Sequence, residues 1–346
     1  MIKVGILGAT GYAGIETVRL LLKHPKAEVV RVVSKSYAGQ KLSDIYPNLR
    51  GICDLTCAEL DVEDIAQSCD VVFTALPHGA SKEVIPALYE KGLKIIDLSG
   101  DFRYNDIKVY EKWYGQPHSA PELLKQSVYG LCELHRDEIP KHRLVGNPGC
   151  YTTCSILGLA PLAANKICDT KNLIIDAKSG VTGAGRGLNL PNLFCECTET
   201  MKAYKIATHR HTSEIEQELS LLAGEDIMVS FTPHLAPMKR GILATCYANL
   251  TEKKTTEEIV ELYREFYKNE EFVRVYPAGE LPEVKHIAGS NYVGIGAVVD
   301  ERLNRAVIVS CIDNLVKGAA GQAVQNMNLL FGLAENVGLT DAGLYL

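Results

Sequence analysis

The chain has 346 residues, which corresponds to about two domains at ~150 residues each. Hydrophobic residues make up 47% and charged residues 23%, close to average usage in globular chains, so intrinsic disorder is excluded as the main state. The net charge of −6 argues against a nucleic-acid-binding protein, and no apolar stretch approaches the ~20 residues of a membrane span.

The first third of the chain alternates short apolar runs with helical patterns, which indicates βαβ units and a parallel sheet. Strands are predicted at 2–7, 29–33, 71–75, 94–98 and 143–145, and helices at 15–23, 81–91 and 151–162. The chain begins directly with a strand and shows no signal-peptide pattern, so we expect a cytoplasmic protein.

Beyond residue 150 the apolar runs show more alternation, which favours a mixed or antiparallel sheet with helices on one face. These runs lie at 172–176, 227–232, 242–250, 293–299 and 305–311, with helical patterns at 213–223, 255–268 and 318–332. We therefore expect an α/β fold. A Rossmann-type, parallel-sheet dinucleotide-binding domain at 1–149 is followed by a catalytic and dimerisation α+β domain with a mixed sheet at 150–313. The C-terminal helix, within 314–346, is expected to return to the first domain.

Eleven cysteines are an odd number in a large chain without a secretory signal, which argues against a disulfide framework. The close pairs are not CxxC, and no second pair or histidine completes a zinc pattern, so we expect no metal. Most of these cysteines are predicted to be buried small hydrophobic residues.

A glycine loop follows the first strand and opens the first helix. Its candidate cofactor contacts are Gly8, Thr10, Gly11, Tyr12, Ala13 and Gly14. Glycines at such a turn let the backbone approach a pyrophosphate at the helix N-terminus. The spacing is GxxGxxG rather than GxGxxG, so a tight turn without a ligand is the alternative.

The end of the second strand indicates which nicotinamide cofactor is used. An NAD site usually has Asp or Glu there to bind the ribose 2′-hydroxyl. This chain has Ser34, Lys35 and Ser36 instead, which suit a 2′-phosphate. We therefore expect NADP, with Ser34 and Ser36 as contacts; the alternative is a polar loop without a ligand.

Cys150 lies in a turn sequence just before a predicted helix. A thiol at a helix N-terminus has its thiolate stabilised by the helix dipole, so Cys150 is a candidate nucleophile. Cys154, one turn later, is expected in the core. A thiol combined with a hydride carrier is the chemistry of acyl-to-aldehyde reduction.

Further candidates lie on loops around predicted strand ends. His209 and His211 flank an arginine before a helix, and either can serve as acid–base partner to the thiol. Ser179 and Gly180 belong to a glycine-rich loop, and Asn314 can bond a carboxamide such as that of nicotinamide. Arg103 offers a cation near the carboxyl edge of the sheet, where ligands of such folds bind.

Seven segments together make the chain resemble the N-acetyl-γ-glutamyl-phosphate reductase family of the semialdehyde dehydrogenase superfamily. They are GATGYAG at 8–14, LSGDFR at 98–103, GNPGCYTT at 146–153, KSGVTGAGRG at 178–187, AYKIATHRHTSEIEQ at 203–217, FTPHLAPMKRGI at 231–242 and DNLVKGAAGQAVQN at 313–326. The family often has proline after the HRHT threonine, where this chain has Ser213.

The resemblance implies a mechanism. The Cys150 thiolate attacks an acyl phosphate, NADPH reduces the thioester, and an aldehyde leaves. His209 or His211 shuttles protons, with His234 as the next candidate, and Arg103 binds phosphate; Asn147 and Tyr204 are further candidate substrate contacts. A small-molecule substrate and a homodimer or homotetramer are expected, with neither nucleic acid nor membrane as partner.

Three alternatives remain open at this stage. The first is the related reductase of carrier-bound aminoadipyl phosphate in lysine synthesis, and the second is aspartate-semialdehyde dehydrogenase. The third, from a different class, is a non-catalytic NADP-sensing module that kept the fold.

Overall fold

The computed structural model describes residues 1–345, which form two compact units. The first comprises residues 1–149 and 319–340, and the second comprises residues 150–318 and the end of the chain from Asp341. The α/β fold class with one parallel and one mixed sheet is confirmed. No helix among residues 1–345 has the length and apolar character needed to cross a membrane.

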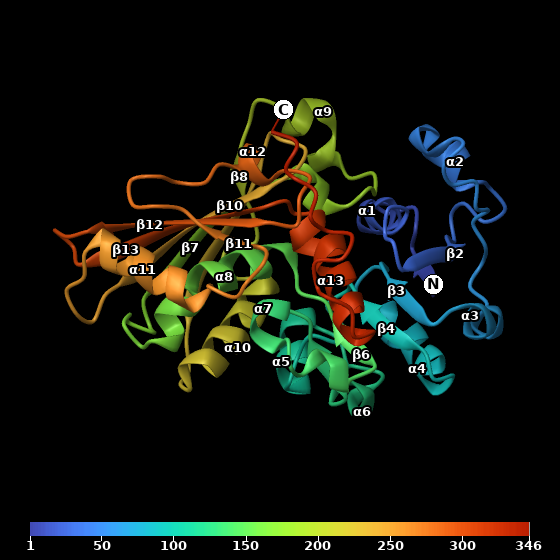
Figure 1. Ribbon diagram of the computed structural model, residues 1–346, viewed down its shortest axis with the longest axis horizontal. Helices are drawn as coiled ribbons and strands as arrows, with labels where there is room; N and C mark the ends of the chain where they lie inside the picture. Colours follow the sequence, from blue (N-terminus) through green and yellow to red (C-terminus); the bar gives the residue numbers. More distant parts are fainter. Residues whose placement is uncertain (346) are drawn as a thin grey trace. The chain divides into compact units, whose positions relative to one another are not determined.

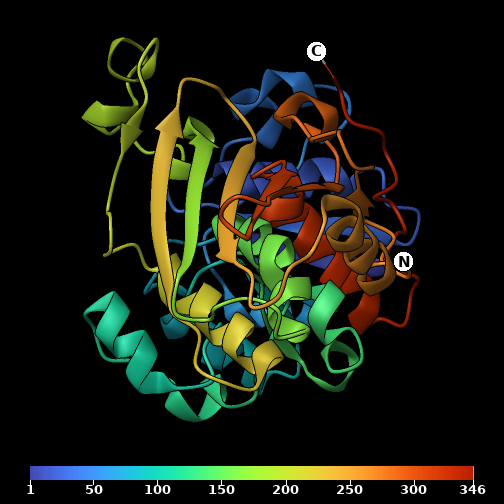
Figure 2. The same ribbon diagram turned by 90° about the vertical axis from the view of Figure 1, so that its left-hand side faces the viewer.

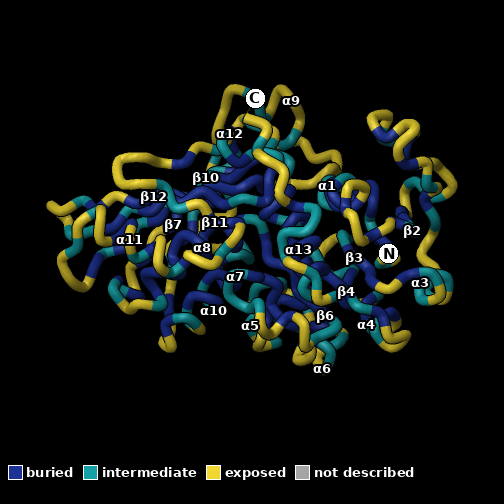
Figure 3. Tube along the Cα trace, in the orientation of Figure 1, coloured by how far each residue is buried: buried dark blue, intermediate teal, exposed yellow. Residues whose placement is uncertain are grey.

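The first unit is built on a six-stranded sheet in the order β2-β1-β3-β4-β6-β5, in which every pair is parallel. All residues of β3 are buried, as expected for a strand covered on both faces (Figures 1 and 3). The strands are β1 Ile2–Leu7, β2 Ala27–Val33, β3 Val71–Thr74, β4 Lys94–Asp97, β5 Ser127–Tyr129 and β6 Leu144–Gly146.

The helices of this unit range from single turns to three turns in length. They are α1 Tyr12–Leu21, α2 Leu42–Ile45, α3 Val62–Ser68, α4 Ser81–Glu90, α5 Ile107–Tyr114, α6 Pro121–Leu124, α7 Cys132–His135 and α13 Gly321–Leu330, with 3₁₀ turns at Pro47–Leu49 and Ile139–Lys141. Asp61 and Asp106 accept backbone N–H groups at the starts of α3 and α5, which explains where these helices begin.

The second unit contains a seven-stranded mixed sheet in the order β11-β12-β13-β10-β7-β9-β8. The β7–β9 and β11–β12 pairs are parallel and the other pairs are antiparallel. The strands are β7 Leu173–Gly180, β8 Lys202–Ala203, β9 Val229–Ala236, β10 Ile242–Asn249, β11 Val273–Val275, β12 Val293–Asp300 and β13 Arg305–Ile312.

Helices α8, α10 and α11 pack against this sheet (Figure 1). Thirteen of the 15 residues of α8 are buried, so this helix is apolar all round and forms the centre of the unit. The helices are α8 Cys150–Ala164, α9 Phe194–Cys197, α10 His211–Ala223, α11 Thr256–Phe266 and α12 Val284–Ile287, with 3₁₀ turns at Val181–Ala184 and Leu190–Asn192. Thr255 and Glu258 form a capping box that starts α11.

The C-terminal helix expected over 314–346 to return to the first domain is α13, which lies in the first unit, but residues 314–318 and those from Asp341 belong to the second unit. A π-helix, Val316–Ala320, precedes α13, and the chain enters the first unit only at Ala319. Asn314 is held in the second unit by hydrogen bonds to Gly241 and Thr182, and Leu344 N–H bonds the Ala288 carbonyl there. These contacts explain why 314–318 and the residues after Asp341 stay with the second unit.

Candidate active site

The glycine loop is packed closely against itself at the start of α1. Gly8 has φ +81°, and a Cβ on Gly14 would lie 2.2 Å from the Gly8 carbonyl oxygen. Gly11 caps α1 without a side-chain hydrogen bond. The N–H groups of the first turn, from Tyr12 and Ala13 to Gly14, therefore stay available to an anion.

The end of β2 is tied to this loop. Ser34 is buried, and its hydroxyl shares a 2.8 Å hydrogen bond with that of Thr10. Tyr46 donates to the Thr10 carbonyl at 2.8 Å. Lys35 and Ser36 are exposed just beyond the strand. The two predicted cofactor segments therefore lie together, as the resemblance implies.

Two buried aspartates organise the carboxyl edge of β4. Asp97 accepts hydrogen bonds from Thr74 and Ser99, and burial raises its pKa. Asp101 accepts the Gly79 and Lys82 N–H groups and so caps the start of α4. The sequence analysis missed both residues, although each precedes or lies in the LSGDFR motif.

Arg103, the predicted phosphate contact, follows this edge. Only 3% of the residue is exposed, and one guanidinium nitrogen donates to the Leu98 carbonyl at 2.9 Å. Asn147 is fully buried: its amide donates to the Ala319 carbonyl at 3.1 Å and accepts from Asn326 at 3.0 Å. These contacts tie Asn147, which directly follows β6, to Ala319 and to α13 within the first unit.

Cys150 is the first residue of α8 and is partly exposed. Its position at a helix N-terminus agrees with the geometry expected for an activated thiol. Cys154 is completely buried and bonds the Ser310 carbonyl at 3.2 Å; burial raises its thiol pKa to about 12. Cys154 is therefore a core residue, as predicted.

All eleven cysteines are free thiols, and eight of them are buried. The expectation that most are small core residues is confirmed. Besides Cys150, the two outside the core are Cys195, which is exposed, and Cys197, which is partly exposed. Among the described residues, no group of three or more His, Cys, Asp or Glu side chains is placed to hold a metal ion.

The two predicted histidines lie in one aromatic cluster around Tyr151, the residue after Cys150. The ring centroid of Tyr151 is 5.7 Å from that of His209 and 6.0 Å from that of His211. The two histidine rings are 4.7 Å apart, and Tyr204 lies 5.6 Å from His209. The fold thus brings together three predicted residues from the segment 204–211, beside the residue that follows Cys150.

The two phenols of this cluster are protonated donors. Burial raises the pKa of Tyr204 to about 12 and that of Tyr151 further still. Tyr204 donates to the Tyr151 hydroxyl at 3.4 Å, which in turn donates to the His234 carbonyl at 2.8 Å. Tyr151 was not predicted from the sequence, although it directly follows the nucleophile candidate.

The environment of His209 favours its neutral form. The His209 Nδ1 accepts the backbone N–H of His211 at 3.2 Å, so the neutral ring carries its proton on Nε2. Burial, with help from Lys205 and Arg210, lowers the His209 pKa to about 4. His209 is therefore a neutral hydrogen-bond donor near pH 7, whereas His211 begins α10.

Asn314 forms hydrogen bonds with two loops of the second unit. The Asn314 amide oxygen accepts the Gly241 N–H at 2.7 Å, and its nitrogen donates to the Thr182 hydroxyl at 3.0 Å. Ser179 is buried and donates to the Gly180 carbonyl. Asn314 thus links the glycine-rich loop to the 239–241 turn, a contact that spacing alone did not reveal.

His234, the next acid–base candidate, lies in β9 of the second unit. Its Nδ1 is 3.1 Å from Asp176, and Lys178 is 2.7 Å from the other Asp176 oxygen. Because β7 and β9 are parallel neighbours, Lys178 and His234 are paired residues. The His234 imidazole therefore pairs with Asp176, while the His234 carbonyl accepts the hydroxyl of Tyr151 from the ring cluster.

Comparison with known proteins assigns the chain to a family. It is 64% identical, over the full length of both chains, to N-acetyl-gamma-glutamyl-phosphate reductase of Acetivibrio thermocellus. The chain belongs to the N-acetyl-gamma-glutamyl-phosphate reductase family. The same enzyme of Desulforamulus reducens is 54% identical over all of both chains, and that of Symbiobacterium thermophilum is 57% identical over 99% of this chain and 98% of its own.

The two parts of this reductase-family chain match two domain families. Residues 3–142 match the semialdehyde dehydrogenase NAD binding domain, and residues 150–314 match the semialdehyde dehydrogenase dimerisation domain. The family resemblance stated on the seven sequence segments is confirmed.

Solved structures support the fold. Aspartate semialdehyde dehydrogenase II from Vibrio cholerae superimposes with a TM-score of 0.73 at 16% identity, covering 96% of this chain and 98% of the other. The aspartate semialdehyde dehydrogenase with NADP from Candida albicans gives a TM-score of 0.69 at 17% identity, covering 97% and 99%.

Proposed function

We propose that this protein reduces N-acetyl-L-glutamyl 5-phosphate to N-acetyl-L-glutamate 5-semialdehyde and phosphate in arginine biosynthesis. The observation that carries the proposal is Cys150 at the start of α8, next to a tyrosine whose ring touches His209 and His211. The full-length identity to reductases of this name supports the choice of substrate.

The covalent steps take place on Cys150. The thiolate sulfur attacks the acyl carbon, a C–S bond forms, the C–O bond to phosphate breaks, and phosphate leaves with the bonding electron pair. When bound, NADPH supplies the hydride that reduces the resulting thioester. The oxyanion left by the hydride takes a proton from the proton shuttle to give the thiohemiacetal. The thiohemiacetal then returns this proton to the shuttle as the C–S bond breaks, which releases the aldehyde and leaves Cys150 as a thiolate.

We assign the proton shuttle to His211 and a hydrogen-bonding role to His209. His209 accepts a hydrogen bond at Nδ1, so its Nε2–H can donate, and its pKa of about 4 keeps the ring neutral near pH 7. A residue in that state can orient an oxygen atom. The shuttle needs a group that takes and returns a proton near the working pH, and His211 is the adjacent imidazole.

The residues of the first unit fit an NADP molecule. Gly11 precedes α1 and has no side chain to bond the N–H groups of its first turn. The Gly8 carbonyl lies so close to Gly14 that a Cβ on Gly14 would not fit. The loop can therefore offer backbone N–H groups to the pyrophosphate. Exposed Lys35 and Ser36 suit the 2′-phosphate, with Ser34 closing the loop through Thr10. Ser179, Gly180 and Asn314 stay candidates for the nicotinamide end, and Arg103 for the substrate phosphate.

We further propose that the protein is a homodimer or homotetramer. Between the β7 loop and α10, large apolar side chains are strongly exposed: Leu188, Leu190, Leu193, Phe194, Met201 and Ile206. Figure 2 shows the yellow-green segment with α9 projecting away from the sheet of its own unit. Exposed apolar patches mark interaction sites, and the segment lies within the match to the dimerisation domain.

We also propose a cytoplasmic location, because a catalytic Cys150 thiol requires a compartment that keeps thiols reduced.

A paired-substrate assay tests the activity. The purified protein is given phosphate and NADP with N-acetylglutamate 5-semialdehyde, the corresponding carrier-bound aminoadipate semialdehyde or aspartate semialdehyde. We expect NADP reduction with the first to exceed the others by at least tenfold in kcat/KM, which is ~1.4 kcal/mol. A preference for either competitor assigns the chain another substrate, and no turnover with any of them favours a non-catalytic NADP-binding role.

A further inference from the structure

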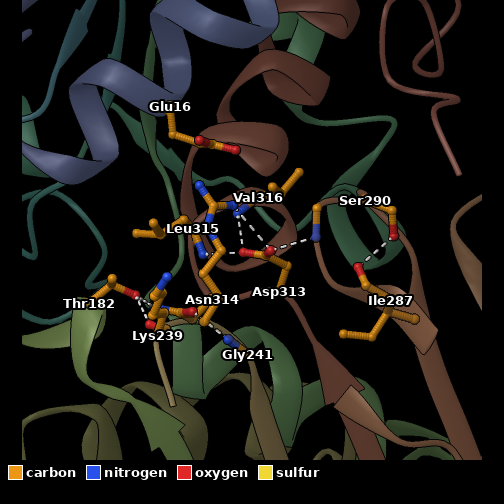
Figure 4. Close-up of polar contacts among 12 residues, drawn as sticks. Glu16, Thr182, Lys239, Gly241, Ile287, Ser290, Asp313, Asn314, Leu315 and Val316 are labelled. Carbon is orange, nitrogen blue, oxygen red and sulfur yellow. Dashed lines mark hydrogen bonds and ion pairs between the residues drawn. The ribbon is translucent and has the colours of Figure 1, made fainter. Parts of the chain in front are cut away.

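Asp313 is a buried carboxylate that the mechanism above does not use. It follows the last residue of β13, and none of its surface is exposed. Its Oδ2 accepts the Gly289 N–H at 2.7 Å and a guanidinium N–H of Arg240 at 3.2 Å. Its Oδ1 accepts the N–H groups of Leu315 and Val316 at 2.8 and 3.1 Å (Figure 4).

The backbone carbonyl of Asp313 completes this arrangement. It accepts the Gly318 N–H at 2.9 Å, five residues later, which is the hydrogen bond that defines a π-helical turn. Together with Oδ1, one residue therefore holds three N–H groups of the segment 315–318. Asn314, the next residue, forms hydrogen bonds with Gly241 and Thr182. The start of the turn is thus anchored to the sheet and to neighbouring loops of its unit.

Gly318 lies directly against the proposed nucleophile. A Cβ on Gly318 would be 2.8 Å from the Cys150 Cβ and 3.2 Å from the Cys150 Cα. Real Cβ atoms do not approach other atoms so closely, so the turn or Cys150 would have to move. The φ angle of Gly318 is not in the left-handed region, so this contact, and not backbone strain, is what requires glycine here.

We propose that Gly318, held by Asp313, is a positioning residue for Cys150: the turn at 315–318 supports the Cβ of the nucleophile and sets the direction of its thiol. The inference rests on the proposed function, since it assumes that Cys150 attacks the substrate.

The cost of misplacing the thiol is expected to appear in the chemical step. A shift of ~1 Å in a reacting group can reduce the rate about 100-fold, because attack needs a defined distance and angle. Moving the thiol off the axis of α8 also weakens its interaction with the helix N-terminus, so more of it stays protonated at a given pH. Binding of NADPH depends on other residues and should not change.

The experiment compares Gly318→Ala with Gly158→Ala. Gly158 lies on the same helix as Cys150, and its added Cβ would meet the Ser310 Cβ at 3.3 Å, far along the helix from the thiol. Each variant is measured for kcat, KM for both substrates, unfolding temperature and the pH midpoint of Cys150 alkylation by iodoacetamide, followed on the Cys150 peptide. Asp313→Asn, which replaces one acceptor oxygen by a donor, is measured alongside.

We expect Gly318→Ala to lower kcat about 100-fold with KM for NADPH unchanged, and to move the alkylation midpoint to higher pH. Asp313→Asn should show the same pattern with at least a tenfold loss. Gly158→Ala is expected to lower the unfolding temperature, because its Cβ would meet the Ser310 Cβ at 3.3 Å, and to keep kcat and the midpoint near those of the unaltered protein.

Two results overturn the positioning role while leaving the proposed function intact. One is a normal kcat and midpoint in folded Gly318→Ala when Cys150→Ser is inactive. The other is an equal loss of kcat in Gly158→Ala. If Cys150→Ser itself retains activity, the nucleophile is wrong, and the proposed function fails together with the inference.

Discussion

Cys150 combines partial exposure with the first position of a long helix, whereas Cys154 on the next turn is buried and its pKa is raised to about 12. Two thiols of one helix therefore have opposite environments. Burial disfavours the thiolate of Cys154, whereas Cys150 is partly exposed at a helix start, where backbone N–H groups can face an anion. Of the two thiols, Cys150 is therefore the one we propose as the nucleophile.

Replacing Cys150 by serine should reduce turnover to below a tenth of the unaltered rate, a barrier increase of at least ~1.4 kcal/mol, while NADPH binding stays nearly intact. Steady-state kinetics and fluorescence titration with NADPH measure the two effects. Cys195→Ser is the matched control, because Cys195 is exposed in the projecting segment and should not affect turnover. Acyl phosphate should protect Cys150 from alkylation. Residual activity above a tenth in Cys150→Ser contradicts the covalent mechanism.

The two histidines should respond differently to substitution by alanine. His211→Ala is expected to lower kcat by roughly 10²–10⁴-fold and to flatten one limb of the pH–rate profile, as loss of a general acid–base group does. His209→Ala should mainly raise KM and keep the shape of the profile, because His209 is a neutral donor fixed by the His211 N–H. The reverse pattern would exchange the two roles, and normal kcat in both would direct attention to His234.

The low pKa of His209 also predicts how stability changes with pH. In the unfolded chain its pKa is near the ordinary 6.5, whereas in the folded protein it is about 4. Between these values the unfolded state binds more protons, so this residue makes the free energy of unfolding fall as pH drops from 6.5 towards 4. Urea unfolding across this range should show a weaker pH dependence in His209→Gln than in the unaltered protein. An identical dependence in both would show that His209 titrates normally.

The glycine loop and the end of β2 are joined, because the Thr10 and Ser34 hydroxyls share a hydrogen bond. A carboxylate at position 34 would therefore stand beside the loop that is proposed to bind the dinucleotide. It would repel a 2′-phosphate and accept a hydrogen bond from a 2′-hydroxyl.

We accordingly expect the unaltered enzyme to prefer NADP strongly, and Ser34→Asp to shift the ratio of kcat/KM values towards NAD by at least tenfold. Ser34→Asn, similar in size but uncharged, separates the effect of charge from that of lost packing. Equal efficiency with both cofactors before any substitution would contradict the assignment of NADP.

The segment 188–206 exposes a cluster of apolar side chains. Leu188 is 95% exposed and Phe194 is 76% exposed. Clusters of this kind are unfavourable in water, so association of copies of the chain is expected to bury them.

The double variant Leu188→Asp, Phe194→Asp should therefore dissociate into smaller species. Leu303→Asp is the control and should not dissociate, because Leu303 is 57% exposed but lies in the β12–β13 turn. Light scattering coupled to size-exclusion chromatography gives the mass of each. A monomeric unaltered protein, or an oligomer that survives the double substitution, would rule out this segment as an interface.

Local sequence features determined much of this protein. Alternating and helical periodicities located every strand of four or more residues and the longer helices of the second unit, because burial on one face imposes the same period on sequence and structure. Three site features were also predicted, because each depends only on residues adjacent in the chain. They are the glycine loop, the hydroxyls after β2 and the cysteine at a helix start. Joint motifs along the whole length then indicated the family, which the comparisons confirm.

Other features depend on contacts between distant segments and had no local signal. The short strands β5, β8 and β11 pair with neighbouring strands, and their two or three residues were not recognised as strands. The equally short β6 was predicted because the turn sequence Asn147-Pro148-Gly149 marks its end. The amide partners of Asn314, the neutral state of His209 and the contact between Gly318 and Cys150 are set by burial and by atoms brought together from far apart in the sequence. The sequence therefore indicates which residues can supply the chemistry. Their protonation states and the contacts that hold them in place are decided by packing, because desolvation and steric exclusion act through space and not along the chain.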